Sequence, residues 1–147
     1  MIIRITKEFT FEASHALDNY DGLCKNIHGH SYKLLVTLKG EPVYDENSPK
    51  LGMIMDFADL KKIVKQEILD SFDHAIVLKN DSRFINIKDT KIVFVPYQPT
   101  CENMLSDFVK RISTRLPKNI ILSNIKLYET ATSCAEWRLE DNFNVDY

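Results

Sequence analysis

An alternation of apolar and polar side chains runs from Ile3 to Phe11 and constrains the fold more than any other feature of the chain. Apolar residues occupy positions 3, 5, 9 and 11, and charged or polar residues occupy positions 4, 6, 8 and 10. A period of two is typical of a β-strand that buries one face, and Lys7 is the one break in it. This strand therefore needs other elements to cover its apolar face.

Three further strands are predicted from composition and from the residues that end them. One runs from about His30 through "SYKLLVTLKG", which is rich in β-branched and aromatic residues and closes at Gly40. The other two cover "IKLYET" and "AEWRL". The segments "EPVYDENSPKLG" and "KNDSRFINIKDT" are predicted to be loops, and the short extended run "KIVFVPYQ" is stopped by prolines.

Two helices are predicted between the second and third of these strands. Asp56 can cap the first helix, which ends near Phe72, and Thr100 can cap the second, which ends before Pro117. The order β-β-α-α-β-β predicts an α+β domain in which two helices cover one face of an antiparallel sheet. The other face and the sheet edges still need cover, so self-association around the sheet is expected.

Length, charge and cysteine content limit the class of protein. The 147 residues are expected to form a single domain, 1-147, and a net charge of −2 without like-charged runs gives no footprint for nucleic acid or an anionic membrane. A small-molecule partner is therefore expected. No signal peptide or transmembrane run is found, which predicts a soluble, cytoplasmic protein. Cys24, Cys101 and Cys134 lack C-x-x-C spacing and are expected to be reduced thiols.

Three of the four histidines, His15, His28 and His30, are candidate metal ligands. Histidines two positions apart on a strand point to the same face, and His15 completes a set of three if the first two strands are neighbours. Neutral imidazoles suit zinc, and three protein ligands leave a fourth position for water or substrate. The alternative is a coincidence of surface histidines, because the H-x-H pattern is short.

Six motifs, in the same order over nearly the whole chain, resemble the 6-pyruvoyl-tetrahydropterin synthase family. They are "FEASHAL", "CKNIHGHSYKL", "GMIMDFADLK", "FDHAIVL", "PTCEN" and "YETATSCAEW". Three residues separate Cys24 from His28, which resembles the bacterial branch of the family, the 6-carboxy-5,6,7,8-tetrahydropterin synthases of the queuosine pathway. The pyruvoyl-forming branch typically has a longer gap.

The resemblance implies the tunnelling fold (T-fold), in which β-β-α-α-β-β subunits assemble side by side into a barrel with the helices outside. It also implies a homo-oligomer, hexamer or tetramer, with active sites at subunit interfaces and a zinc ion held by His15, His28 and His30. The implied enzyme is a zinc-dependent lyase. It converts 7,8-dihydroneopterin triphosphate to 6-carboxy-5,6,7,8-tetrahydropterin, acetaldehyde and triphosphate.

Catalytic roles are implied for Cys24, Asp73 and His74. Cys24, four positions before a metal ligand, resembles the family's proton-transferring base, and the other two resemble the pair that relays protons with it. A carboxylate can fix the tautomer of an imidazole and stabilise its protonated form. The alternative for this pair is a helix-terminal histidine that interacts with the helix dipole.

Substrate contacts are implied for Glu129, Thr100 and Glu102. Glu129 resembles the pterin anchor, since a carboxylate can accept two parallel N–H bonds, whereas a lone strand glutamate is usually solvated. Thr100 and Glu102 resemble groups near the pterin, although Thr100 serves equally well as a helix cap. Lys25 is a candidate for binding the triphosphate, which needs Lys or Arg.

Two other functions stay open on the sequence. A pyruvoyl-forming synthase would use the same site and make a product of different mass. A noncatalytic zinc- or pterin-binding protein would keep the histidines, but the joint presence of Cys24, Asp73 and His74 argues against it. Cys101 and Cys134 depart from residues common in the family, so the shape of the pterin pocket is not determined by the resemblance.

Overall fold

The computed structural model describes residues 1–143, and the last four residues of the acidic tail and of the predicted 1-147 domain lie outside the described residues. Its elements, in chain order, are β1 (Ile3–His15), η1 (Leu23–Lys25), β2 (His28–Gly40), α1 (Phe57–Val64), η2 (Lys65–Leu69), α2 (Asp70–Phe72), β3 (Ala75–Lys79), β4 (Ile92–Val95), α3 (Cys101–Ser113), β5 (Ile121–Tyr128), β6 (Cys134–Arg138) and η3 (Leu139–Asn142).

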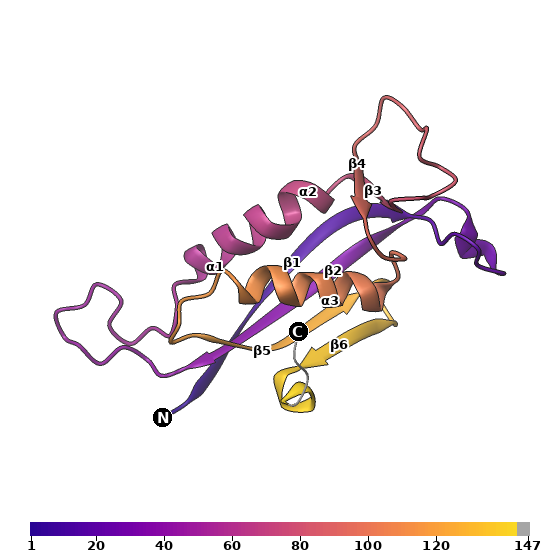
Figure 1. Ribbon diagram of the computed structural model, residues 1–147. Helices are drawn as coiled ribbons and strands as arrows, with labels where there is room; N and C mark the ends of the chain where they lie inside the picture. The colour runs from indigo at the N-terminus through magenta and orange to yellow at the C-terminus, as the bar shows by residue number, and fades with distance from the viewer. Residues whose placement is uncertain (144–147) are drawn as a thin grey trace.

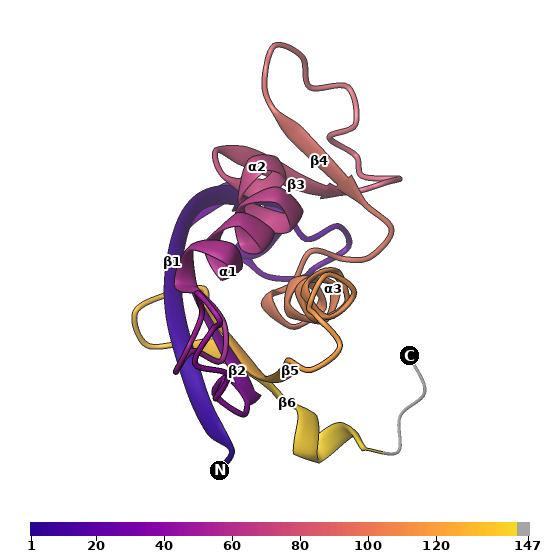
Figure 2. The same ribbon diagram turned by 90° about the vertical axis from the view of Figure 1, so that its left-hand side faces the viewer.

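A six-stranded sheet in the order β4-β3-β1-β2-β5-β6 forms the frame of the molecule. β1 and β2 pair antiparallel over their whole length, from Ile3 opposite Gly40 to His15 opposite His28, and β5 and β6 continue the antiparallel pairing. The sheet curls, and both the α1–α2 segment and α3 lie on its concave side (Figures 1 and 2). The predicted α+β class with two helices on one face is therefore confirmed.

Two short strands, β3 and β4, pair in parallel and were not part of the predicted antiparallel sheet. The apolar run of β3 begins two residues after the helix ends, so hydrophobic periodicity alone cannot separate it from the helix. The predicted extended run "KIVFVPYQ" contains β4. Parallel pairing depends on a crossover through the α1–α2 segment, which a strand pattern does not reveal.

Both predicted helix caps are present. The Asp56 carboxylate accepts a hydrogen bond from the Ala58 backbone N–H at 2.8 Å, and the Thr100 hydroxyl accepts one from Asn103 N–H at 3.2 Å. Each satisfies one of the backbone donors that a helix leaves free at its first turn. The two helices therefore begin where the sequence predicts.

The first helical segment contains a π turn, η2, between α1 and α2. Its fully buried side chains are spaced by four residues, which is wider than the α-helical period of about 3.6. These residues are Leu60, Val64, Ile68 and Phe72. The wider π turn offsets the drift that this spacing would cause, so all four side chains face the core.

The core lies between the helices and the concave face of the sheet. Phe11 stacks on Tyr32 with ring centroids 5.0 Å apart, and Phe108 of α3 meets Phe72 edge to face at 4.9 Å. The alternate residues of β1, such as Thr6 and Glu8, are exposed on the opposite face. That face is polar, and none of the helices in residues 1–143 covers it.

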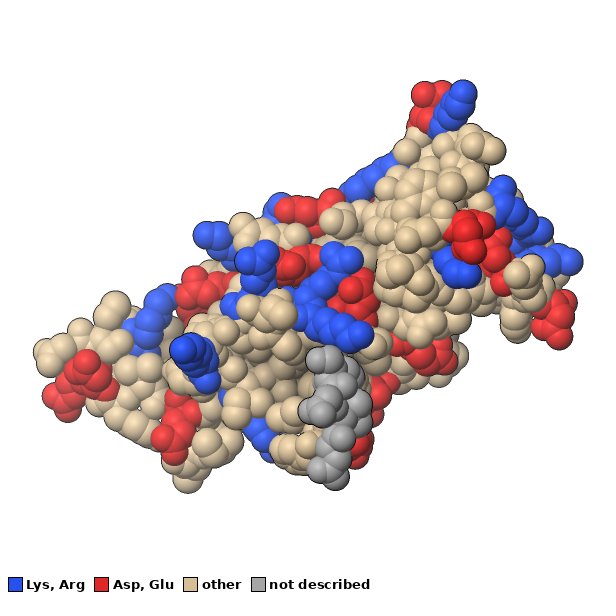
Figure 3. Space-filling model, viewed as in Figure 1, with Lys and Arg blue, Asp and Glu red and all other residues tan. Residues whose placement is uncertain are grey.

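Charged side chains of both signs are mixed over the face that Figure 3 shows, which agrees with the small net charge of −2. Within residues 1–143, every helix falls short of the length and apolar character that a bilayer crossing requires.

Candidate active site

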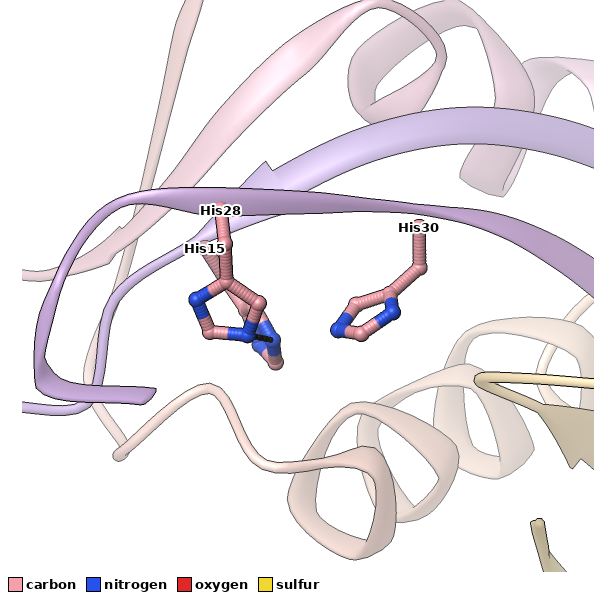
Figure 4. A group of neighbouring side chains, drawn as sticks. All are labelled: His15, His28 and His30. Atoms are coloured by element: carbon pink, nitrogen blue, oxygen red, sulfur yellow. Dashed lines mark hydrogen bonds between the residues drawn. The ribbon is translucent and has the colours of Figure 1, made fainter. Parts of the chain in front are cut away.

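Three imidazoles converge at the end of the β1–β2 hairpin (Figure 4). His15 lies opposite His28 in the strand register, and His30 follows two residues later on the same face of β2. Nitrogen atoms of the three rings all lie within 4.8 Å of one another, and His15 Nε2 is 3.0 Å from His28 Nε2. The expected pairing of the two histidine-bearing strands is confirmed.

The outer nitrogens of two rings determine where their lone pairs point. His15 Nδ1 lies 2.7 Å from the Pro99 carbonyl oxygen, and His28 Nδ1 lies 2.7 Å from the carbonyl oxygen of Asn26. A carbonyl oxygen only accepts, so each Nδ1 carries the proton and each Nε2 of a neutral ring presents a lone pair. Two lone pairs that face each other at 3.0 Å require a proton or a cation between them.

His30 shows that a metal ion fits this position better than a proton. Its Nε2 is buried and has no hydrogen-bond partner among residues 1–143. A shared proton would serve only two of the three nitrogens, whereas a tetrahedral zinc ion takes all three and keeps one position open. His15, His28 and His30 are therefore the residues that could hold such an ion.

Burial keeps these rings neutral. Burial lowers the pKa of His15, which is only 2% exposed, and also lowers that of His30. The carboxylate of Glu129 opposes this shift, with Oε1 3.5 Å from His15 Nε2 and 3.8 Å from His30 Nε2. Neutral imidazole is the form that binds a metal ion.

A cleft of about 280 Å³ opens beside His15 and brings together four other predicted site residues. Its lining includes Cys24 from η1, Thr100 and Glu102 from the start of α3, and Glu129 from the turn after β5. The remaining lining residues are Leu17, Tyr20, Cys101, Ser133, Cys134 and Ala135. Thr100 both caps α3 and lines the cleft, so its two readings are compatible.

Two cysteines of this cleft differ in environment. Cys24 is partly exposed, and its carbonyl accepts a hydrogen bond from Leu17 N–H at 3.0 Å. Cys101 donates its thiol proton to the Leu127 carbonyl at 3.3 Å, and burial raises its pKa to about 11. Cys101 is therefore a neutral wall residue at neutral pH, whereas Cys24 is free to exchange protons at the mouth.

Asp73 and His74 form a close pair, but they lie apart from this cleft. His74 Nδ1 is 2.9 Å from Asp73 Oδ1, and the same carboxylate oxygen accepts a hydrogen bond from Glu12 N–H at 2.9 Å. His74 lines a separate hollow of about 500 Å³ with Ser14 and Ser31. Those two serines alternate with the histidine-bearing positions and face the opposite side of the sheet, so one chain does not join this pair to Cys24.

A larger hollow of about 800 Å³, between α1 and the segment before β5, contains none of the predicted site residues. Its charged side chains pair with one another: Lys50 with Asp56 at 2.5 Å, and Arg115 with Glu67 at 2.7 Å. This hollow therefore offers few unpaired groups to a ligand.

Several contacts of the site have no signal in the sequence. The carbonyl groups of Pro99 and Asn26 act through the backbone, which any residue provides. Arg83 belongs to the loop for which no motif was found, and its guanidinium donates to the Lys25 carbonyl. Its Nε lies 4.0 Å from the carboxylate of Asp18. The loop after β3 thus supports the segment that carries Cys24.

A curled sheet with both helices on one face and three histidines converging at a strand end defines a T-fold protein with a candidate metal centre. Comparison with known proteins agrees with this class. Residues 4–140 match the family model described as 6-pyruvoyl tetrahydropterin synthase, and the chain belongs to this family.

Two bacterial relatives share the name 6-carboxy-5,6,7,8-tetrahydropterin synthase. The protein from Haemophilus influenzae is 36% identical over 144 residues, covering 93% of this chain and 99% of its own. The protein from Aquifex aeolicus is 30% identical over 164 residues, covering 92% and 98%. Both alignments therefore include the whole histidine and cleft region.

Solved structures share the fold. A crystal structure of an uncharacterized protein from Wolinella succinogenes superposes with a TM-score of 0.78 at 22% identity, over 95% of this chain and 99% of that one. The Caenorhabditis elegans 6-pyruvoyl tetrahydropterin synthase superposes with a TM-score of 0.66 at 25% identity, over 94% and 96%.

Proposed function

We propose that this chain catalyses the reaction after which its bacterial relatives are named, as a zinc-dependent lyase of queuosine (7-deazapurine) biosynthesis. The substrate is 7,8-dihydroneopterin triphosphate. With one water molecule, it yields 6-carboxy-5,6,7,8-tetrahydropterin, acetaldehyde and triphosphate. The observation that carries the proposal is the pair of facing Nε2 atoms, 3.0 Å apart, beside a cleft lined by Cys24 and Glu129.

Glu129 anchors the pterin in this proposal. Its carboxylate accepts two parallel N–H bonds, one from the amino group of the pterin and one from a ring nitrogen. Because Glu129 Oε1 lies 3.5 Å from His15 Nε2, a ligand held there lies beside the histidines. Thr100 and Glu102 line the same cleft and bound the ring from the α3 side.

Cys24 moves protons on the substrate's side chain. Its partial exposure at the cleft mouth leaves the sulfur accessible to a bound ligand. His15, His28 and His30 would hold the zinc ion, which when bound supplies Lewis acidity toward the side-chain hydroxyls. The neutral Cys101 thiol does not compete for protons, because its pKa is raised to about 11.

Asp73 and His74 act on the site of a neighbouring subunit in this proposal. His74 has a side chain that is 78% exposed, and it faces away from the cleft of its own chain. Asp73 accepts from the Nδ1–H of the ring, leaving Nε2 to exchange protons with Cys24 of another copy. A hexamer or tetramer closed around the polar face of the sheet supplies that second copy.

Product analysis tests the proposed reaction. The zinc-loaded protein is incubated with 7,8-dihydroneopterin triphosphate, and acetaldehyde and pterin mass are followed together. Acetaldehyde with the 6-carboxy-tetrahydropterin mass supports the proposal, whereas a 6-pyruvoyl mass without acetaldehyde assigns the chain to the other branch. Neither product, with zinc and pterin still bound, leaves a noncatalytic binding protein.

Mixing two inactive variants tests the shared site. Cys24→Ala and His74→Ala should each lose turnover, and subunits reassembled from a mixture should recover part of it, because some sites then combine an intact Cys24 with an intact His74. If the mixture stays inactive although mixed oligomers form, both residues act within one chain.

A further inference from the structure

We infer that Lys91 is the positioning residue of the Asp73–His74 pair, and this inference depends on the proposed catalytic role of that pair. Lys91 directly precedes β4, and its carbonyl accepts a hydrogen bond from Ile76 N–H of β3 at 2.9 Å. The start of β3 and the residue before β4 are thereby held side by side, close to the end of α2 (Figure 1).

The ammonium group of Lys91 caps the end of the helix. Lys91 Nζ donates to the Asp70 carbonyl and to the Asp73 carbonyl, both at 2.8 Å. The last carbonyls of a helix lack backbone partners and carry the negative end of its dipole, so a lysine here supplies both hydrogen bonds and the favourable charge.

The peptide group between Asp73 and His74 is held from both sides. Its carbonyl oxygen accepts from Lys91 Nζ at 2.8 Å, and its N–H donates to the Glu12 carbonyl at 2.6 Å. The orientation of this peptide plane determines ψ of Asp73 and φ of His74, and therefore where both side chains leave the backbone. Lys91 thus controls the direction of the pair without contacting the substrate.

The pair needs this support for two reasons. His74 has φ of 61°, a left-handed conformation that is unfavourable for a residue other than glycine. Its side chain is 78% exposed, so packing does not orient the ring. The backbone clamp by Lys91 and Glu12 and the contact with the Asp73 carboxylate at 2.9 Å hold the imidazole in place.

The experiment compares Lys91→Met with Lys88→Met in the full zinc-loaded protein. Lys88 belongs to the same loop, and within residues 1–143 no hydrogen bond or ion pair joins it to another side chain, so it is a matched loss of charge. We expect Lys91→Met to lower kcat by about 10- to 100-fold, as is usual for residues that orient functional groups, with KM and zinc content unchanged. Lys88→Met should retain the parent kcat.

A spectroscopic readout separates positioning from general stability. In histidine-labelled protein, the ring-nitrogen NMR signals of His74 should shift or broaden in Lys91→Met, while those of the other three histidines stay in place. Lys91→Arg should recover part of kcat and the His74 signals, because a guanidinium can also donate to two carbonyls. It also serves as the folded variant if Lys91→Met lowers Tm too far.

The outcomes distinguish this inference from the proposed function. Unchanged His74 signals in Lys91→Met, or loss of all histidine signals alike in both Lys91 variants, would overturn the positioning role. Altered His74 signals with unchanged kcat would mean that Lys91 orients the ring but the pair is not catalytic; His74→Ala would then also keep its activity.

Discussion

Zinc binding by His15, His28 and His30 should stabilise the folded chain, because only the fold brings the three rings together. The facing lone pairs at 3.0 Å place a repulsion in the metal-free protein that the ion removes. At a free zinc concentration of about 1,000 Kd, the free energy of unfolding rises by about 4 kcal/mol. At about 2–4 °C per kcal/mol for a chain of this size, Tm should rise by about 8–16 °C.

The assay is thermal unfolding at pH 7.5 of protein stripped with EDTA, with and without added zinc. His28→Ala is the informative variant, because His28 is less buried than His15 and its removal disturbs the core less. We expect it to lose most of the zinc-dependent shift. His74→Ala removes the one histidine outside the triad and should retain the shift.

Equal zinc-dependent shifts in His28→Ala and in the parent protein would show that zinc binds elsewhere on the chain. No shift in the parent protein, with zinc content confirmed as zero, would refute the reasoning from the lone pairs.

Three other measurements test separate parts of the site. Glu129→Gln should weaken pterin binding by about 2 kcal/mol, roughly thirtyfold in Kd by titration calorimetry, because a charged acceptor is lost; unchanged affinity would exclude the anchor role. Cys101 should alkylate at pH 8 about a hundredfold more slowly than a thiol of pKa 9.0, and faster as pH rises toward its pKa of about 11; labelling as fast as that of exposed Cys134 would contradict this. Thr100→Ala should lower the unfolding free energy in urea by about 1 kcal/mol through loss of the cap, while Thr100→Ser retains it.

Local patterns were enough to predict the elements that bury one face. The alternation from Ile3 to Phe11 lies within β1, and the caps Asp56 and Thr100 begin both helices. The strand ends were less predictable. β1 extends to His15 because it pairs with β2 along its whole length, and pairing partners are not visible in one strand's composition.

The candidate site was only partly accessible from the sequence. The H-x-H spacing of His28 and His30 predicts a shared face directly, and the pairing of β1 with β2 brings His15 to it. Contacts that depend on tertiary structure gave no pattern. The Lys91 hydrogen bonds to backbone carbonyls are of this kind, since a lysine before a short strand is usually a solvated surface residue.

The π turn at Lys65–Leu69 determines where the chain can gain or lose residues. Each residue advances a helix by about 100°, so a one-residue deletion there would regularise the backbone hydrogen bonds but turn Phe72 and Asp73 relative to Leu60. Either Phe72 would leave the core or the catalytic pair would swing away from its clamp. The loop between β2 and α1 carries no such constraint. Natural length variation should therefore concentrate in that loop and spare the helix.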